Sequence, residues 1–362
     1  MTSVVGYGTG NSIEEQDPVG GRRKDHTVVA TQNSRVNLSA LDLVPIIQDR
    51  SVAQCVRDAT TLAQRLEAAG YARVWYAEHH NSESFASSAT ALLMGQALAA
   101  TSTIRVGSGG IMLPNHVPIT VAESFGTLEN LYPGRVDLGL GRAPGTDMRT
   151  ALALRRGQGG HDTFRQDIHQ LERYFGGQNG EPIRAAVARD TNVPLWILGS
   201  STDGALVAAS LGLPYVFASH FAPAMIMQAL EVYRTSFDAS APTATLDEPY
   251  VMIAANVLAA DTEAEARRQF TTHQLLVRGM ARNNRGPLQP PVDEVDVTPA
   301  EAAFVEQHLA VSAVGAPHQV VEQLDQIVEV TRADELMLNS YAFDPEVRAR
   351  SFELTAKAWS ES

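Results

Sequence analysis

The spacing of apolar and polar residues divides most of the chain into short strands and amphipathic helices. Eight apolar segments do not alternate with polar residues, which is typical of parallel strands that are buried on both faces. Segments with helical periodicity separate them, and Gly or Pro marks many boundaries. The predicted strands are LSALDLVP (38–45), RVWYA (73–77), IRVGSGG (104–110), RVDLGLG (135–141), PLWILG (194–199), PYVFAS (214–219), YVMIAANVLAA (250–260) and DELMLNS (334–340).

This alternation of strands and helices predicts an α/β fold, and specifically a (β/α)8 TIM barrel. The alternative is a doubly wound sheet, which would place a Gly-rich dinucleotide turn after its first strand. The segment LVPIIQDRS at 43–51 offers no such turn, and the chain has no GxGxxG or P-loop motif. The sequence therefore favours the barrel.

Two segments depart from the pattern. Residues 1–37 have no sustained period and are predicted to form a poorly ordered N-terminal extension, which leaves 38–362 as a single domain. Residues 261–316 are charged and helical and then rich in Arg, Asn and Pro, so they form an insertion longer than an ordinary connection. This insertion is either a solvated excursion or a lid over the barrel mouth.

Composition narrows the possible partners and the compartment. The formal net charge of -13 argues against binding nucleic acid or an anionic membrane surface. No apolar window reaches the roughly 20 residues that cross a bilayer. Cys55 is the only cysteine, so no internal disulfide can form, and we predict a reducing, cytoplasmic location.

The predicted strand ending at Ala77 is followed by Glu78, His79 and His80. Adjacent residues of an extended segment point to opposite sides, so the two histidines are not expected to bind one metal, and no HExxH spacing is present. We predict no metal site from this pair. One imidazole, His79, is expected to face the barrel mouth as an acid, base or hydrogen-bond donor, and His80 is expected to be structural.

Small and basic residues occupy the ends of the next predicted strands. Residues 107–110 read GSGG, which permits close approach of a flat ligand but equally a bulge or tight bend. Arg142 stands between glycines at another strand end, where it can bind a phosphate or form an ordinary salt bridge. Gly199, Ser200 and Ser201 lead into a helix, as either a helix cap or an anion site. Together with Arg142 they predict a phosphate site.

Four of these motifs occur in the order found in a known family. The segments WYAEHHN, VGSGGIMLPNHVPITVAESFGTLENLYPGRVDLGLGRAPGTD, ILGSSTDGALVAASLGLPYVFASHFAP and ELMLNSYAFDP resemble the bacterial luciferase-like flavin monooxygenases. The likeness runs from about Leu38 to Trp359. It implies a barrel that takes reduced FMN from a NAD(P)H-dependent flavin reductase and forms a flavin hydroperoxide with dioxygen. That intermediate would oxygenate a small organic substrate, and members are commonly homodimers.

The resemblance also assigns roles to residues. It implies that His79 is catalytic, that the Gly109-Gly110 pair lies against the flavin ring, often through a cis peptide, and that Arg142 binds the flavin phosphate. The helix-start part of the phosphate site would be Gly199, Ser200 and Ser201. Residues expected to line the substrate pocket are Leu43, Met112, Leu113, Phe217 and His220.

Two positions differ from the true luciferases and indicate the nonluminous branch. Gly141 stands where those proteins carry a reactive cysteine, and Ser200 stands where they carry an acidic residue. Two other functions stay open at this point. Related barrels bind a deazaflavin and transfer hydride, although the Glu-His-His motif favours FMN, and a barrel of this kind can also bind flavin without catalysis.

Overall fold

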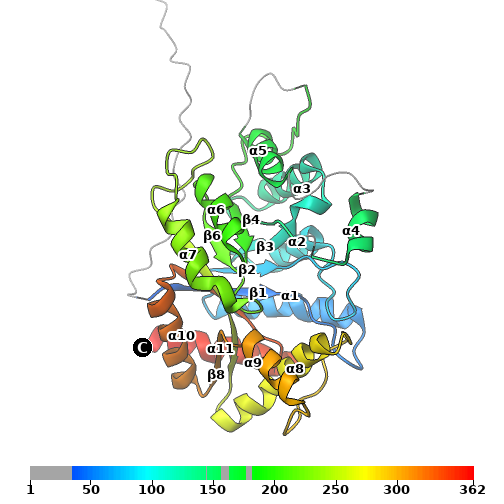
Figure 1. Cartoon of the computed structure of the whole chain (residues 1–362). Helices are drawn as coiled ribbons and strands as arrows, with labels where there is room; N and C mark the ends of the chain where they lie inside the picture. Colours follow the sequence, from blue (N-terminus) through cyan, green and yellow to red (C-terminus); the bar gives the residue numbers. More distant parts are fainter. Residues whose placement is uncertain (1–34, 144, 156–162, 177–181) are drawn as a thin grey trace, which may run out of the picture. The chain divides into compact units, whose positions relative to one another are not determined.

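The computed structural model describes residues 35–143, 145–155, 163–176 and 182–362. Within them the predicted (β/α)8 barrel is confirmed, because eight parallel strands close on themselves and helices surround them (Figure 1). The strands pair in the order β1-β2-β3-β4-β5-β6-β7-β9 and back to β1. They are β1 (Asn37–Asp42), β2 (Arg73–Tyr76), β3 (Arg105–Met112), β4 (Val136–Gly141), β5 (Leu195–Gly199), β6 (Tyr215–Phe217), β7 (Val251–Ala259) and β9 (Glu335–Asn339).

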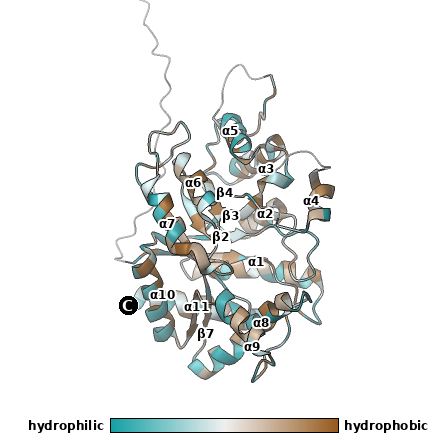
Figure 2. Cartoon of the chain, in the orientation of Figure 1, coloured by the Kyte–Doolittle hydropathy of each residue, from teal (hydrophilic) through white to brown (hydrophobic). Residues whose placement is uncertain are grey.

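The helices bury one apolar face against these strands. In α5 (Phe164–Phe175), Phe164, Ile168, Leu171 and Phe175 recur on one side and are buried. Figure 2 shows polar and apolar residues side by side along the helices. The others are α1 (Val52–Ala68), α2 (Thr90–Ala100), α3 (Pro118–Leu131), α4 (Met148–Arg155), α6 (Thr202–Ser210), α7 (Ile226–Thr235), α8 (Glu263–Ala281), α9 (Pro299–His308), α10 (Pro317–Thr331) and α11 (Pro345–Glu361), with 3-10 turns η1 (Leu113–Asn115) and η3 (Pro223–Met225).

A tryptophan pair fills the inside of the barrel. The Trp75 side chain is fully buried, and its ring meets that of Trp196 edge-on, with 5.3 Å between centroids. Gly107 of β3 makes room for this indole, because a Cβ atom at that position would overlap Trp75. The barrel interior is therefore a packed core rather than a channel.

Ion pairs close the end of the barrel where the strands begin. Arg73 donates to Glu335 at 2.8 and 3.1 Å and to Asp137 at 2.9 Å. Its guanidinium also stacks 4.7 Å from the Trp196 ring centroid, and the Tyr250 hydroxyl donates to Glu335 at 2.8 Å. Because both carboxylates are paired and hydrogen-bonded, the amino end of the barrel tolerates these buried charges.

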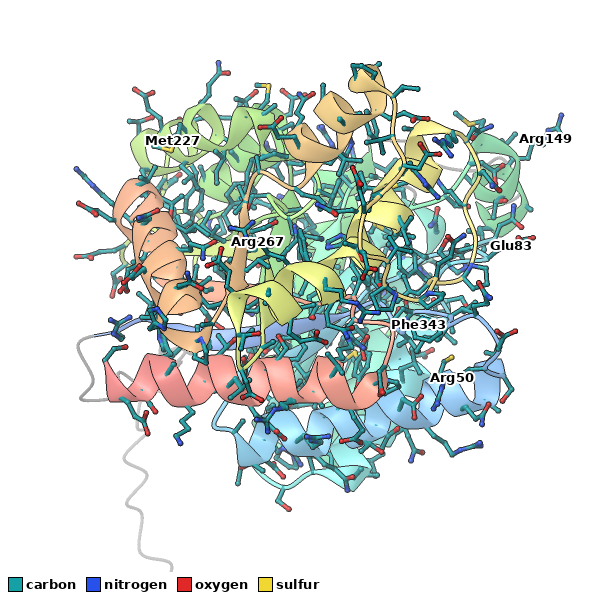
Figure 3. All side chains as sticks on the ribbon, turned by 90° about the horizontal axis from the view of Figure 1, so that it is seen from below. Arg50, Glu83, Arg149, Met227, Arg267 and Phe343 are labelled. Carbon is teal, nitrogen blue, oxygen red and sulfur yellow. The ribbon has the colours of Figure 1, made fainter. Side chains whose placement is uncertain are left out.

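The structure differs from the sequence expectations at several boundaries. Of the predicted N-terminal extension 1–37, residues 1–34 lie outside the described residues. Residues 35–37 belong to the barrel, because β1 begins at Asn37 and the Trp359 indole donates to the Val36 carbonyl at 3.0 Å. In Figure 3 α11, which carries Trp359, lies beside α1, and the two helices are in contact.

The predicted insertion 261–316 begins with a helix, as expected, and contains further regular structure that sequence reasoning did not identify. It comprises α8, α9 and a ninth strand, β8 (Ser312–Gly315), which pairs parallel to the second half of β7. Between the helices, the Leu288 backbone exchanges hydrogen bonds with Ile46 and Gln48 at 2.7 and 3.0 Å. The Ser84 hydroxyl donates to the Gly286 carbonyl at 2.7 Å. The middle of the insertion is thus attached to the segments that come after β1 and β2.

Among the described residues, no helix combines the length and apolar character needed to span a bilayer.

Candidate active site

The carboxyl ends of parallel barrel strands meet at one rim, where barrel enzymes place their functional groups. Strands β2, β3, β4 and β5 are consecutive neighbours in the barrel wall. The residues singled out from the sequence therefore occupy one continuous arc of this rim. They are His79 after β2, Gly109 and Gly110 in β3, Arg142 after β4, and Gly199, Ser200 and Ser201 at the end of β5.

Arg142 lies beside the first turn of α6. Its Nη2 atom is 3.5 Å from Oδ2 of Asp203, which lies in that turn. The helix begins at its N-cap residue Ser201, whose hydroxyl accepts from the Gly204 N–H at 3.4 Å. The structure thus brings together the arginine and the helix start that the sequence analysis paired. Ser201 acts as a cap in the same place where the helix dipole favours an anion.

The salt bridge between Arg142 and Asp203 leaves the guanidinium available. The Arg142 side chain is 34% exposed and that of Asp203 is 75% exposed, so the pair is weak. Gly199 and Ser200, which precede the cap, are half-buried. A phosphate placed here can accept from the arginine fork, the serine hydroxyls and the free N–H groups of α6.

The peptide bond between Gly109 and Gly110 is cis, as the family resemblance implies. The register of β3 against β4 also shifts between Ser108 and Ile111, so the bulge that the sequence analysis gave as the equal alternative for these glycines is present as well. A Cβ on Gly110 would lie 2.8 Å from the Gly139 carbonyl oxygen. Gly109 remains partly exposed, so its bare backbone can contact a flat ligand at the rim.

His79 and His80 point to different partners, as expected for adjacent residues. The His79 ring packs 5.2 Å from the Phe85 ring, between centroids, and its backbone N–H donates to the Ser87 carbonyl at 3.0 Å. Burial lowers the pKa of the His79 imidazole, although a hydrogen bond with the Gly145 backbone opposes this effect. His79 is therefore uncharged at neutral pH and can accept a proton.

Glu78 is buried and holds His80 in place. Its Oε1 atom lies 2.8 Å from Nε2 of His80 and 2.8 Å from Nε2 of His116. Burial opposes ionisation of this carboxyl, but the hydrogen bonds from His116 and His80 outweigh it and hold the Glu78 pKa at about 2. The Met112 N–H also donates to Oε2, at 3.1 Å. This contact links the end of β2 to the end of β3.

Two further histidines are buried in this region: His220 lies near His79, and His273 lies near His220. His220, expected to line the substrate pocket, and His273 of α8 are 8% and 5% exposed, and Nδ1 of each has no hydrogen-bond partner among the described residues. Burial, reinforced by neighbouring imidazoles, lowers the pKa of His220 to about 4 and that of His273 to about 3. The His273 ring meets Tyr341 edge-on at 4.6 Å. These neutral side chains supply polar atoms in an otherwise apolar environment.

The sequence analysis missed His116, His273 and Tyr341 as neighbours of this site. His116 and Tyr341 stand inside the quoted motifs LPNHVP and LNSYAFDP, and both come after predicted strands or the turns that end them. The strand-end rule alone was enough to include them. His273 gave no such signal, because it lies on a helix of the insertion.

The fold is a closed parallel barrel, and its rim carries an arginine beside a helix start and a buried histidine on neighbouring strand ends. Residues 42–335 match the family model described as luciferase-like monooxygenase. A luciferase-like monooxygenase of Escherichia coli (strain K12) is 45% identical over 323 residues, which cover 88% of this chain and 96% of the relative. The protein YvbT of Bacillus subtilis (strain 168) is 47% identical over 326 residues, covering 89% and 96%. The chain belongs to the luciferase-like monooxygenase family and is an oxygenase-type enzyme.

Solved structures of other proteins share the fold of this chain. The crystal structure of apo-MsnO8 superposes with a TM-score of 0.83 at 34% identity, covering 91% of this chain and 99% of that one. The oxygenating constituent of 3,6-diketocamphane monooxygenase from Pseudomonas putida, solved with FMN, has a TM-score of 0.66 at 16% identity, covering 91% and 99%. An F420-dependent secondary alcohol dehydrogenase has a TM-score of 0.63 at 14% identity, covering 90% and 99%. The last two show the barrel fold alone.

Proposed function

We propose that this enzyme takes reduced FMN from a separate NAD(P)H-dependent flavin reductase and uses it, with dioxygen, to oxygenate a small organic substrate. The observation that carries the proposal is the position of Arg142 beside the start of α6, on the same rim as Gly109 and His79. The arginine and the helix start suit a phosphate group, and the bare glycine backbone suits a flat ring. The homodimer and the cytoplasmic location predicted from the sequence belong to this proposal.

Each residue of the arc has a role in binding. Arg142 holds the phosphate with its guanidinium fork, and Gly199, Ser200 and Ser201 add backbone N–H groups and hydroxyls at the start of α6. The Gly109-Gly110 backbone supports one face of the ring, where a side chain at Gly110 would collide with β4. These contacts fix the cofactor between the end of β3 and the end of β5.

When bound, reduced FMN supplies the electrons that activate dioxygen. His79 stands at the edge of this site as a neutral imidazole and accepts or returns a proton during oxygen transfer. The middle of the insertion, attached through Leu288 and Gly286, acts as a lid that limits water at the rim. Water exclusion favours oxygen transfer over release of peroxide.

The phosphate role is tested by comparing two arginine variants. Arg142→Ala should weaken the affinity for FMN by about 10- to 100-fold, since hydrogen bonds to charged groups contribute about 1.5–3 kcal/mol. Its affinity for riboflavin, which lacks the phosphate, should change little. Arg149→Ala is the matched control, because Arg149 is an exposed arginine of α4. Equal loss for both flavins would remove the phosphate role from Arg142.

The cofactor is tested by following oxygen uptake with reduced FMN and with a reduced deazaflavin, each with and without the protein. A protein-dependent change in uptake with FMN alone supports the proposal. Hydride transfer from the deazaflavin, without oxygen uptake, would establish the other cofactor, whose barrel relative shares the fold. FMN binding without any effect on its reaction with oxygen would indicate a noncatalytic flavin-binding barrel.

A further inference from the structure

Three possible metal ligands meet next to His79. The Oε1 atom of Glu78 lies 2.8 Å from Nε2 of His80 and 2.8 Å from Nε2 of His116. One ligand atom from each residue lies within 4.8 Å of the other two. His80 follows β2, and His116 follows η1 at the end of the neighbouring β3. The sequence analysis considered only the adjacent pair His79 and His80, whereas the fold brings His116 to the same carboxylate oxygen as His80.

We propose that Glu78, His80 and His116 bind one divalent transition-metal ion of the zinc type. Imidazole nitrogen and carboxylate oxygen are ligands that Zn²⁺, Co²⁺ and Ni²⁺ accept. Zn²⁺ lies about 2.0–2.2 Å from such atoms, so two ligand atoms of a tetrahedral ion are roughly 3.3 Å apart. The two distances of 2.8 Å from the Glu78 oxygen are shorter than this spacing, and small side-chain rotations lengthen them to it. Water completes the coordination.

The surroundings of Glu78 suit this role. The Met112 N–H donates to its Oε2 atom at 3.1 Å, and the Asn115 side-chain nitrogen lies 3.5 Å from Oε1. These contacts orient a carboxylate whose side chain is only 1% exposed. Hydrogen-bonded carboxylates of this kind make stronger metal ligands, because their geometry is fixed before the ion arrives.

The two imidazoles are open to solvent, unlike the carboxylate. The His80 side chain is 17% exposed and that of His116 is 30% exposed, so an ion can reach both from outside the barrel. Each imidazole coordinates through Nε2 and carries its proton on Nδ1. Bonds from Nε2 to the ion then replace the hydrogen bonds from Nε2 to Glu78. His79 lies between Glu78 and His80 in the chain. A bound ion therefore fixes the backbone on both sides of His79.

The test uses the untagged full chain after treatment with a chelator, titrated with Co²⁺ and then with Zn²⁺. We expect one Co²⁺ per chain, the visible absorption bands of a four- or five-coordinate ion, and loss of these bands when Zn²⁺ displaces Co²⁺. Glu78→Gln and His116→Asn should each lower the affinity at least about a hundredfold, since loss of an outer contact alone costs 10- to 100-fold. His318→Asn, an exposed histidine of α10, is the control and should bind as the wild type does.

Circular dichroism of each metal-free variant checks folding, and His80→Asn replaces any variant that is not folded. Absence of a stoichiometric Co²⁺ site in the wild type would overturn the proposal. Undiminished binding in both Glu78→Gln and His116→Asn would do the same, as would an equal loss in His318→Asn. In those cases the three side chains form only a hydrogen-bonded cluster. Because the titration needs neither flavin nor turnover, its outcome is independent of the proposed monooxygenase activity.

Discussion

The guanidinium of Arg142 and the carboxylate of Asp203 face each other between the end of β4 and the first turn of α6, with 3.5 Å between Nη2 and Oδ2. An anion that binds at this helix start meets the positive charge of Arg142 and the negative charge of Asp203 together. The acidic side chain therefore competes with a phosphate for the arginine. In the proposed phosphate site, this competition lowers the affinity for the anion.

Asp203→Asn should raise the affinity for FMN by up to roughly fivefold, because an exposed ion pair contributes about 0.2–1 kcal/mol and its loss frees Arg142. Riboflavin affinity should stay the same, since it has no phosphate. Quenching of flavin fluorescence during titration measures both constants. A lower affinity for FMN in this variant would show that Asp203 supports the site rather than competing in it.

His79→Ala should leave FMN affinity within about twofold of the wild type, because the proposed phosphate contacts lie at β4 and α6. The reaction of bound reduced FMN with dioxygen should change in rate and release more peroxide, since a neutral imidazole no longer stands at the site. Stopped-flow absorbance and a peroxide assay measure these effects, with His318→Asn as the control. Unchanged rate and peroxide yield would remove His79 from the chemistry.

Gly107→Ala should destabilise the fold by about 1–3 kcal/mol, because the added Cβ overlaps the Trp75 indole inside the barrel. Gly286→Ala is the matched control, since a Cβ there meets nothing within 4 Å, and it should stay within about 0.5 kcal/mol of the wild type. Urea unfolding followed by tryptophan fluorescence compares them. Equal midpoints for the two variants would contradict the packing argument.

Glu67 of α1 accepts the backbone N–H groups of Ser102 and Ile104 at 2.8 and 3.0 Å. Burial opposes its ionisation, but these hydrogen bonds and that of Thr103 lower its pKa from 4.5 to about 2. The folded pKa is below the unfolded one, so the stabilisation is complete above pH 4.5 and is lost as the pH falls towards 2.

Glu67→Gln should therefore unfold more easily than the wild type near neutral pH, and the difference in free energy of unfolding should shrink below pH 4.5. Denaturant unfolding at a series of pH values measures this difference. A gap that stays constant or widens on acidification would show that the charge of Glu67 does not stabilise the connection between α2 and β3.

Strand periodicity predicted the barrel well because most of its strands are apolar runs bounded by Gly, Pro or polar residues. β8 escaped detection because it has only four residues, SAVG, and comes after a charged stretch. Its stability comes from pairing with β7, which is a tertiary effect that local sequence does not contain.

The candidate site also combines features that local sequence predicts with features that depend on tertiary packing. Arg142 and Ser201 follow neighbouring strands, so the strand-end rule predicted their proximity. The contacts of Glu78 with His116, and the position of His273 near His220, depend on side-chain directions and on how α8 packs. No spacing in the sequence encodes those directions. The strand-end rule could place residues such as His116 at the rim, but not the side-chain contacts they make there, and it gave no signal for His273 of the insertion.

The ion pairs around Arg73 and the edge-on indoles of Trp75 and Trp196 block passage through the barrel from the side where the strands start. Every reactant of the proposed reaction must consequently enter at the opposite end of the barrel, where the strands end. A bulky cofactor that binds first narrows this entrance for any molecule that binds later. For the proposed reaction, this shared entrance favours an order in which the flavin binds before the molecule to be oxidised and leaves after it.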